Sequence, residues 1–403
     1  MPSIEGASIR KILDSRGNAT VEVLIHAPRA FGRAAAPSGA STGTHEPPAW
    51  PRGGVDEAIR TFRDSVASKL KGLDVADQAG FDRTLKEIDG TANFAHIGAN
   101  VATAASLANA RAGASAAGKL LFRYVGEGGR PSLPLPLGNV IGGGRHAVGG
   151  TTIQEFLVVS QGPTLLANVF ANARVHHLVR DALVKKLPQA PLGRGDEGAW
   201  IAQLEDEEAL ALLADICHDV ERDLGFPVRP ALDLAASEFF REGKYQYKDR
   251  ALTREQQVDL VEHFVDEYAL FSVEDPFDEE DFAAFAELTK RIGARCKVIG
   301  DDIFVTNVER LRRGIESGAG NAILIKPNQI GTLSDTRAAV ELAHRSGYAT
   351  VMSHRSGETT DDTIAHLAVG FGCFGIKTGA VGGERIAKLN ELIRIEEELQ
   401  EDV

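Results

Sequence analysis

Cysteine is scarce in this chain, and its scarcity limits how the fold can be stabilised. The three cysteines, Cys217, Cys296 and Cys373, lie far apart in the sequence and form no CxxC pair. This number and spacing give no disulfide framework of the kind found in small secreted proteins. The sequence therefore favours a reducing compartment.

Long apolar runs are also missing. No apolar stretch reaches the roughly 18–20 residues of a membrane-spanning helix, so no membrane span is predicted. The first residues, MPSIEGASIRKILDSRG, lack the apolar core of a signal peptide. We therefore expect a soluble cytoplasmic protein.

The chain has no excess of positive charge. Its formal net charge is −13 at pH 7, and a phosphate backbone needs a basic surface, so a nucleic-acid partner is not expected. An acidic excess keeps a protein soluble and suits one that binds cations.

The N-terminal part predicts an α+β domain. An opening strand is expected at 19–25, a Gly/Ser/Thr-rich loop at 37–48, and helices from about 55 to 118, where alanine and glycine suit close packing. The segment 128–139 (GGRPSLPLPLGN) has three prolines in twelve residues and predicts a linker. We place the domain boundaries at 1–128 and 129–403.

Short apolar runs alternate with amphipathic helices from about residue 226 onward. One of these helices begins with Thr253 and Gln256 in the spacing of a capping box. Repeated β-then-α units imply parallel strands, and their number favours a closed barrel whose C-terminal strand ends form the active-site face. Six strand-like runs end in a charged or polar residue: Asp233, Glu274, Asp301, Lys326, His354 and Lys377.

Three of these residues are carboxylates that would repel one another at a single opening. Either they are protonated or cations neutralise them, and an all-oxygen set favours a hard ion such as Mg²⁺. The alternative is that each acid pairs with a nearby lysine or arginine. Their occurrence in successive units favours the metal.

Basic residues accompany these acids. Lys326 follows a buried run, and desolvation with nearby cations would lower its pKa and make it a usable general base; a structural ion pair is the alternative. His354, Arg355 and Ser356 suit an oxyanion, although an exposed arginine in a turn is also common. Lys377 could face a substrate carboxylate.

Two further segments carry chemistry in predicted loops. The sequence GDEG places Asp196 and Glu197 between glycines, and GGGRHAVGGTTIQEF contains His146, Gln154 and Glu155. The second segment lacks the spacing of a P-loop or a dinucleotide fingerprint. Mobile loops that close over a site are the preferred interpretation.

Taken together, these motifs resemble the enolase (phosphopyruvate hydratase) family over essentially the whole chain. The resemblance is carried by motifs that occur in the family's order: DSRGNATVEV, PSGASTG, IQEF, GDEG, SVEDPF, GDDIFVTN, ILIKPNQIGT, SHRSGET, IKTGA and ERIAKLNELIRIEEEL. It implies an α+β cap on an eight-stranded β/α barrel with irregular first units. It also implies the reversible, Mg²⁺-dependent dehydration of 2-phosphoglycerate to phosphoenolpyruvate.

The resemblance also implies roles for individual residues. Asp233, Glu274 and Asp301 would bind one Mg²⁺, and Ser41 a second that arrives with substrate. Lys326 would take the C2 proton, and Glu197, with its pKa raised among carboxylates and Glu155 in support, would help the C3 hydroxyl leave. Arg355 and Ser356 would hold the phosphate, and Lys377 would lie on the carboxylate side. His354 would lie at the mouth near the substrate, His146 on a closing loop, and Gln154 would also bind substrate.

A homodimer, or an octamer built from dimers, is implied as well. Arg10 and Glu22 match positions that pair across the family's interface with Glu397 and Arg394. The chain departs from the family pattern at Gly142 and Arg145 and in the short loop TGAVGGER. We expect these departures to affect the closure of loops over the site more than the chemistry.

Two other functions remain open. A lyase or racemase of the enolase superfamily would share the barrel, the carboxylates and the lysine, but would not need SHRSGET or GDEG. A non-catalytic enolase-like binding protein would be expected to have lost Lys326, Glu197 or a metal ligand, and none is lost.

Overall fold

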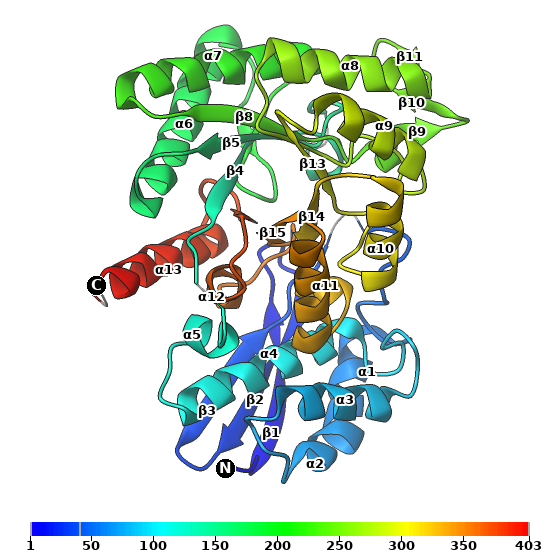
Figure 1. Ribbon diagram of the computed structural model, residues 1–403, viewed down its shortest axis with the longest axis vertical. Coiled ribbons are helices and arrows are strands. Elements are labelled where there is room, and N and C mark those ends of the chain that lie inside the picture. The colour runs from blue at the N-terminus through cyan, green and yellow to red at the C-terminus, as the bar shows by residue number, and fades with distance from the viewer. Residues whose placement is uncertain (1, 40–41, 130, 148, 402–403) are drawn as a thin grey trace.

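The structure is a computed structural model that describes residues 2–39, 42–129, 131–147 and 149–401. A cap (blue and cyan in Figure 1) lies at one end of a β/α barrel, whose helices run from green to red. The expected combination of an α+β cap with a barrel is confirmed. Across the described residues, no helix is long and apolar enough to cross a membrane.

The cap is a three-stranded antiparallel sheet covered by helices. Its strands are β1 (Gly6–Leu13), β2 (Ala19–Ala27) and β3 (Ala30–Ala35), in that order. The prediction that 19–25 opens the sheet is wrong, because β1 precedes it and alternates only weakly between buried and exposed residues. The helical elements are α1 (Gly54–Thr61), η1 (Phe62–Val66), α2 (Ala67–Leu70), α3 (Gln78–Asp89), α4 (Ala99–Ala116) and α5 (Leu121–Val125).

Helix α4 lies directly on the cap sheet, as its small residues predicted. A Cβ atom added to Gly32 in β3 would lie only 2.0 Å from the carbonyl oxygen of Ala108 in α4. Most of α4 is buried between the sheet and the barrel. The small residues therefore let helix and strand approach backbone to backbone.

The barrel consists of eight strands closed by pairing of the last strand with the first. In spatial order they are β4 (Leu135–Gly142), β5 (Glu155–Ser160), β8 (Val228–Asp233), β12 (Ser272–Glu274), β13 (Lys297–Gly300), β14 (Ala322–Ile325), β15 (Ala349–Ser353) and β16 (Gly375–Lys377). Strand β5 is antiparallel to both neighbours, so the expected irregularity of the first units is confirmed. The first barrel strand begins inside the segment read as a linker, which corrects that prediction.

Helices cover the outside of the barrel: α6 (Leu165–Lys186), α7 (Asp206–Leu224), α8 (Arg254–Glu267), α9 (Phe282–Ile292), α10 (Val308–Ser317), α11 (Leu333–Arg345), α12 (Thr363–Gly370) and α13 (Gly383–Gln400). The predicted capping box of Thr253 and Gln256 is present at the start of α8. Short elements fill the connections: η2 (Gly144–His146), β6 (Gly193–Arg194), β7 (Trp200–Ile201), η3 (Ala236–Phe239), β9 (Phe240–Arg241), β10 (Lys244–Gln246), β11 (Ala251–Leu252) and η4 (Pro327–Gln329).

The barrel interior is divided into an apolar part and a charged part. A compact apolar cluster of strand residues, among them Leu137, Leu157, Ile299, Leu324 and Val351, fills the interior. The charged side chains follow at the C-terminal ends of the parallel strands. The cap meets the barrel near this end, where backbone hydrogen bonds join Ser38 to Gly357 in both directions.

Candidate active site

The six strand-end residues lie at the same mouth of the barrel, as predicted. Each is the last residue of its parallel strand or follows it directly, because the strands run in one direction and end on one face. One pocket is lined by five of the six, and the sixth, Glu274, contacts Lys377 within it. Further predicted residues line the same pocket: His146, Gln154, Glu155, Glu197, Arg355 and Ser356. Ser41 lies outside the described residues, and its neighbour Gly39 lines the pocket.

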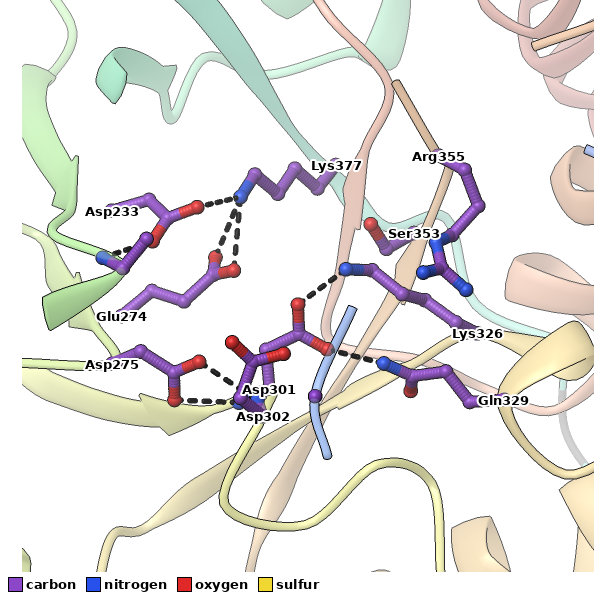
Figure 2. Close-up of polar contacts among 12 residues, drawn as sticks. Asp233, Glu274, Asp275, Asp301, Asp302, Lys326, Gln329, Ser353, Arg355 and Lys377 are labelled. Atoms are coloured by element: carbon purple, nitrogen blue, oxygen red, sulfur yellow. Dashed lines mark hydrogen bonds and ion pairs between the residues drawn. The ribbon is translucent and has the colours of Figure 1, made fainter. Parts of the chain in front are cut away.

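Lys377 holds two of the predicted metal ligands. Its Nζ donates to Asp233 Oδ2 at 2.8 Å and to both oxygens of Glu274 at 2.9 Å, and it lies 3.3 Å from Glu155 Oε2 (Figure 2). Burial and then Asp233 raise the pKa of Glu274 well above its ordinary value. The pKa of Lys377 is also raised well above normal, because these acids outweigh the effect of burial.

Lys326 forms an ion pair with the third predicted ligand, Asp301. Burial disfavours the charged ammonium, but Asp301 outweighs it and the pKa of Lys326 is raised. The expectation of a lowered lysine pKa is therefore wrong for this structure, in which Asp301 is the neighbour with the largest effect. The other oxygen of Asp301 accepts a hydrogen bond from Gln329 Nε2 at 2.8 Å.

Two acids that the sequence reasoning passed over complete this cluster. Asp275 accepts hydrogen bonds from the backbone N–H groups of Asp301 and Asp302, at 2.9 and 2.7 Å (Figure 2). Burial and then neighbouring carboxylates raise the pKa of both Asp275 and Asp302 well above normal. Ligand oxygens of Asp275, Asp301 and Asp302 lie within 4.8 Å of one another. In the sequence, each of these acids directly follows a predicted metal ligand, in SVEDP and in GDD, and this doubling could have pointed to Asp275 and Asp302.

Glu155 and Glu197 face each other on the opposite side of the mouth, next to His146. His146 Nδ1 lies 3.4 Å from Glu155 Oε1 and 3.9 Å from Glu197 Oε1. Glu155 is the first residue of β5, and the reversed direction of this strand brings its beginning to the mouth. Gln154, which precedes it, donates to Asp233 Oδ2 at 3.4 Å.

Glu197 has a polar surrounding that the sequence did not reveal. Its Oε2 accepts a hydrogen bond from Asn139 of β4 at 3.0 Å, and its Oε1 lies 3.2 Å from His354 Nε2. Burial would raise the pKa of Glu197, but His354 and His146 lower it well below its ordinary value. The predicted rise is thus found at Glu155, where burial and Glu197 raise the pKa, and not at Glu197.

Arg355 is buried at the cap side of the pocket, which excludes an exposed turn arginine. Its Nη1 and Nη2 donate to the two carboxylate oxygens of Glu46, both at 3.0 Å, and Nη1 also donates to Asn328 Oδ1 at 2.9 Å. Glu46 comes from the cap loop and was not predicted. The cap therefore supplies part of the pocket wall.

The two positions that depart from the family pattern are Gly142, the last residue of β4, and Arg145, in the connection that follows it. Arg145 Nε lies 2.6 Å from Glu238 Oε2 and so ties this connection to the segment that follows β8. A Cβ atom added to Gly142 would make an ordinary contact with Ala199. Neither position contacts the predicted metal ligands in the contacts that the structure gives.

Comparisons with known proteins cover both parts of the chain. The family model for the enolase C-terminal TIM barrel domain matches residues 130–403, and the model for the enolase N-terminal domain matches residues 4–125. A protein named enolase from Methanothermobacter thermautotrophicus is 53% identical over 98% of this chain and 97% of its own length. Enolases from Halorubrum lacusprofundi and Halobacterium salinarum are 50% and 52% identical, over 98% and 99% of this chain and 99% and 100% of their own lengths. Family models and relatives together cover nearly every residue, and the chain belongs to the enolase family.

Proposed function

We propose that this protein is a phosphopyruvate hydratase, a carbon–oxygen lyase that interconverts 2-phosphoglycerate and phosphoenolpyruvate in glycolysis and gluconeogenesis. One observation carries the proposal: a lysine, a buried carboxylate cluster and a Glu155–Glu197 pair face one pocket from different strands and loops. Full-length similarity to enolases supports it. The deprotonated C2 of such a substrate needs both a base and strong electrostatic stabilisation of the adjacent carboxylate.

Asp233, Glu274 and Asp301 would hold the first Mg²⁺. The fit rests on their chemistry, since all three are buried oxygen ligands of the hard type that Mg²⁺ prefers. Ser41 would serve a second Mg²⁺. Bound Mg²⁺ would neutralise the charge that develops on the substrate carboxylate.

Lys326 would remove the C2 proton and Glu197 would deliver a proton to the C3 hydroxyl, with Glu155 assisting. Cations on the carboxylates would lower the pKa of Lys326, which is the direction that a general base requires. Arg355, Ser356, His354 and His146 would contact the substrate phosphate and the leaving hydroxyl. Lys377 and Gln154 would lie on the side of the substrate carboxylate.

The test is an assay of the purified protein with 2-phosphoglycerate and Mg²⁺, in which phosphoenolpyruvate is followed by its ultraviolet absorbance. We expect activity that a chelator removes and added Mg²⁺ restores. Lys326→Ala should lower kcat by at least about 100-fold, because a general base contributes that much or more. Lys69→Ala, on the exposed side of α2, is the matched control and should keep full activity.

Inactivity of the wild-type protein with metal present would overturn the proposal and favour another superfamily lyase or a binding protein. Activity that survives Lys326→Ala would overturn only the assignment of the base. The domain limits 1–128 and 129–403 and the cytoplasmic location are part of the same proposal. The limits are supported by the change from cap helix α5 to barrel strand β4, and the location by the scarcity of cysteine.

A further inference from the structure

Arg385 is a buried arginine to which neither the sequence motifs nor the proposed chemistry gives a role. It lies in the first turn of α13, within the ERIAKLN segment, and its side chain is 0% exposed. A guanidinium in such a position must direct its N–H groups at acceptors, because an unpaired buried charge is costly. Its acceptors therefore show what it holds in place.

The acceptors of Arg385 come from two loops of the active site. Nη1 donates to the backbone oxygen of Arg355 at 2.6 Å, and Nη2 donates to the backbone oxygens of Ser356 at 2.6 Å and Asp196 at 3.1 Å. The first two belong to the SHRSG loop and the third to the GDEG loop. One side chain thus joins the loop that carries His354 to the loop that carries Glu197.

Arg385 also lies 3.2 Å from Glu384 Oε1 through Nε, and it contacts the imidazole of His354. Nη1 lies 2.9 Å from His354 Nδ1. A guanidinium has donors only and does not lose its proton in proteins, so Nδ1 must accept and cannot carry hydrogen. A neutral His354 then carries its hydrogen on Nε2, the nitrogen 3.2 Å from Glu197 Oε1.

His354 is held neutral in this environment. Burial and Arg385 together lower its pKa to about 4, against the opposite effect of Glu197 and Glu358. The opposite tautomer would place an N–H against the guanidinium and a lone pair against the Glu197 carboxylate. Both contacts would be repulsive.

We propose that Arg385 is a positioning residue that fixes His354 as the Nε2–H tautomer, with Nε2 on the side of Glu197. The assignment of the His354 tautomer rests on the contacts described above. Its effect on turnover rests on the proposed function, in which Glu197 handles the proton of the leaving hydroxyl. Holding Glu197 in one orientation and one hydrogen-bonding state is what that step requires.

The deciding experiment is nitrogen NMR of the full-length protein labelled with ¹⁵N-histidine at pH 7, without substrate. His354→Gln identifies the His354 signals by their loss. We expect the wild-type ring to show a protonated Nε2 and an unprotonated Nδ1, and Arg385→Met to show a substantial Nδ1–H population. A wild-type ring with Nδ1–H, or with both nitrogens protonated, would overturn the proposal even if no variant folds.

Lys388→Met is the matched control. Lys388 lies one turn further along α13, is 1% exposed, and binds Glu358 at 2.7 Å and the Thr359 backbone oxygen at 2.5 Å, without touching His354. It should leave the tautomer unchanged. An equal shift in both variants would mean general loosening of α13 and would overturn the specific role of Arg385.

Turnover supplies a separate readout. Arg385→Lys keeps the charge but loses the fork of donors, and we expect kcat to fall about 100-fold. Unchanged kcat together with an altered tautomer would overturn the effect on turnover. Because the NMR measurement needs no reaction, failure of the proposed activity would leave the tautomer result standing.

Discussion

One buried histidine, His176, lies against an active-site loop and should make the stability of the protein depend on pH. His176 in α6 is fully buried, and its Nε2 lies 2.8 Å from the backbone oxygen of Gly198, next to Glu197. Trp200 packs against the ring, with centroids 5.0 Å apart. Burial lowers the pKa of His176 to about 4. Protonation of His176 would therefore bury a positive charge beside the GDEG loop.

This lowered pKa predicts a loss of stability in acid. The unfolded chain, with a histidine pKa near 6.5, binds the proton before the folded chain does, so the stabilisation is complete above about pH 6.5 and is lost as the pH falls toward 4. At pH 5 the loss from this residue should be about 2 kcal/mol. Urea unfolding at pH 7 and pH 5 should show a smaller pH effect in His176→Gln than in the wild type. An equal pH effect in both proteins would contradict the assignment.

At the scale of secondary structure elements, the contact between α4 and β3 leaves no space at Gly32. Gly32→Ala should destabilise the protein by about 1–3 kcal/mol, because the added methyl group must push the helix from the sheet. Gly6→Ala in β1 of the same sheet is the matched control, since a Cβ atom there meets nothing within 4 Å. Chemical denaturation measures both. Equal stability of the two variants would show that α4 shifts at little cost.

The direction of each strand explains how much of the site the sequence could predict. Asp233, Glu274 and Lys377 could be placed together because parallel strands end on one face. Glu155 breaks this rule: it is the first residue of a strand that runs the other way, the sequence placed it in a loop, and only the family resemblance gave it a role. No local pattern pointed to Glu46 or Asn139, whose contacts with the site depend on the packing of distant segments.

The same reasoning explains the errors in the fold. Strand β4 was read as linker because prolines interrupt it, yet Pro136 lies near its beginning, before the register with β5 starts at Leu137. The pKa directions of Lys326 and Glu197 were wrong because the nearest charged neighbour decides such a shift. That neighbour lies far away in the sequence in both cases.

At the scale of the whole molecule, the proposed dimer is open to a direct test. Within the chain, Glu22 lies 3.4 Å from Arg10 and 3.5 Å from Arg33, and the nearby Leu13 is 71% exposed. Such an exposed apolar side chain beside charged groups suits an interface rim. Sedimentation should give at least twice the 43.1 kDa chain mass. A mass of one chain would refute both the dimer and the octamer.

Closure of the barrel has a consequence for synthesis on the ribosome. Leu137 of β4 pairs with Lys377 of β16, about 240 residues later. At ~5–20 residues per second, β4 is made on the order of 10–50 s before its partner. The cap sheet, by contrast, is complete by Ala35. A nascent chain thus carries an unpaired strand edge until almost the last helix, and chains that stop before Lys377 should be prone to aggregation.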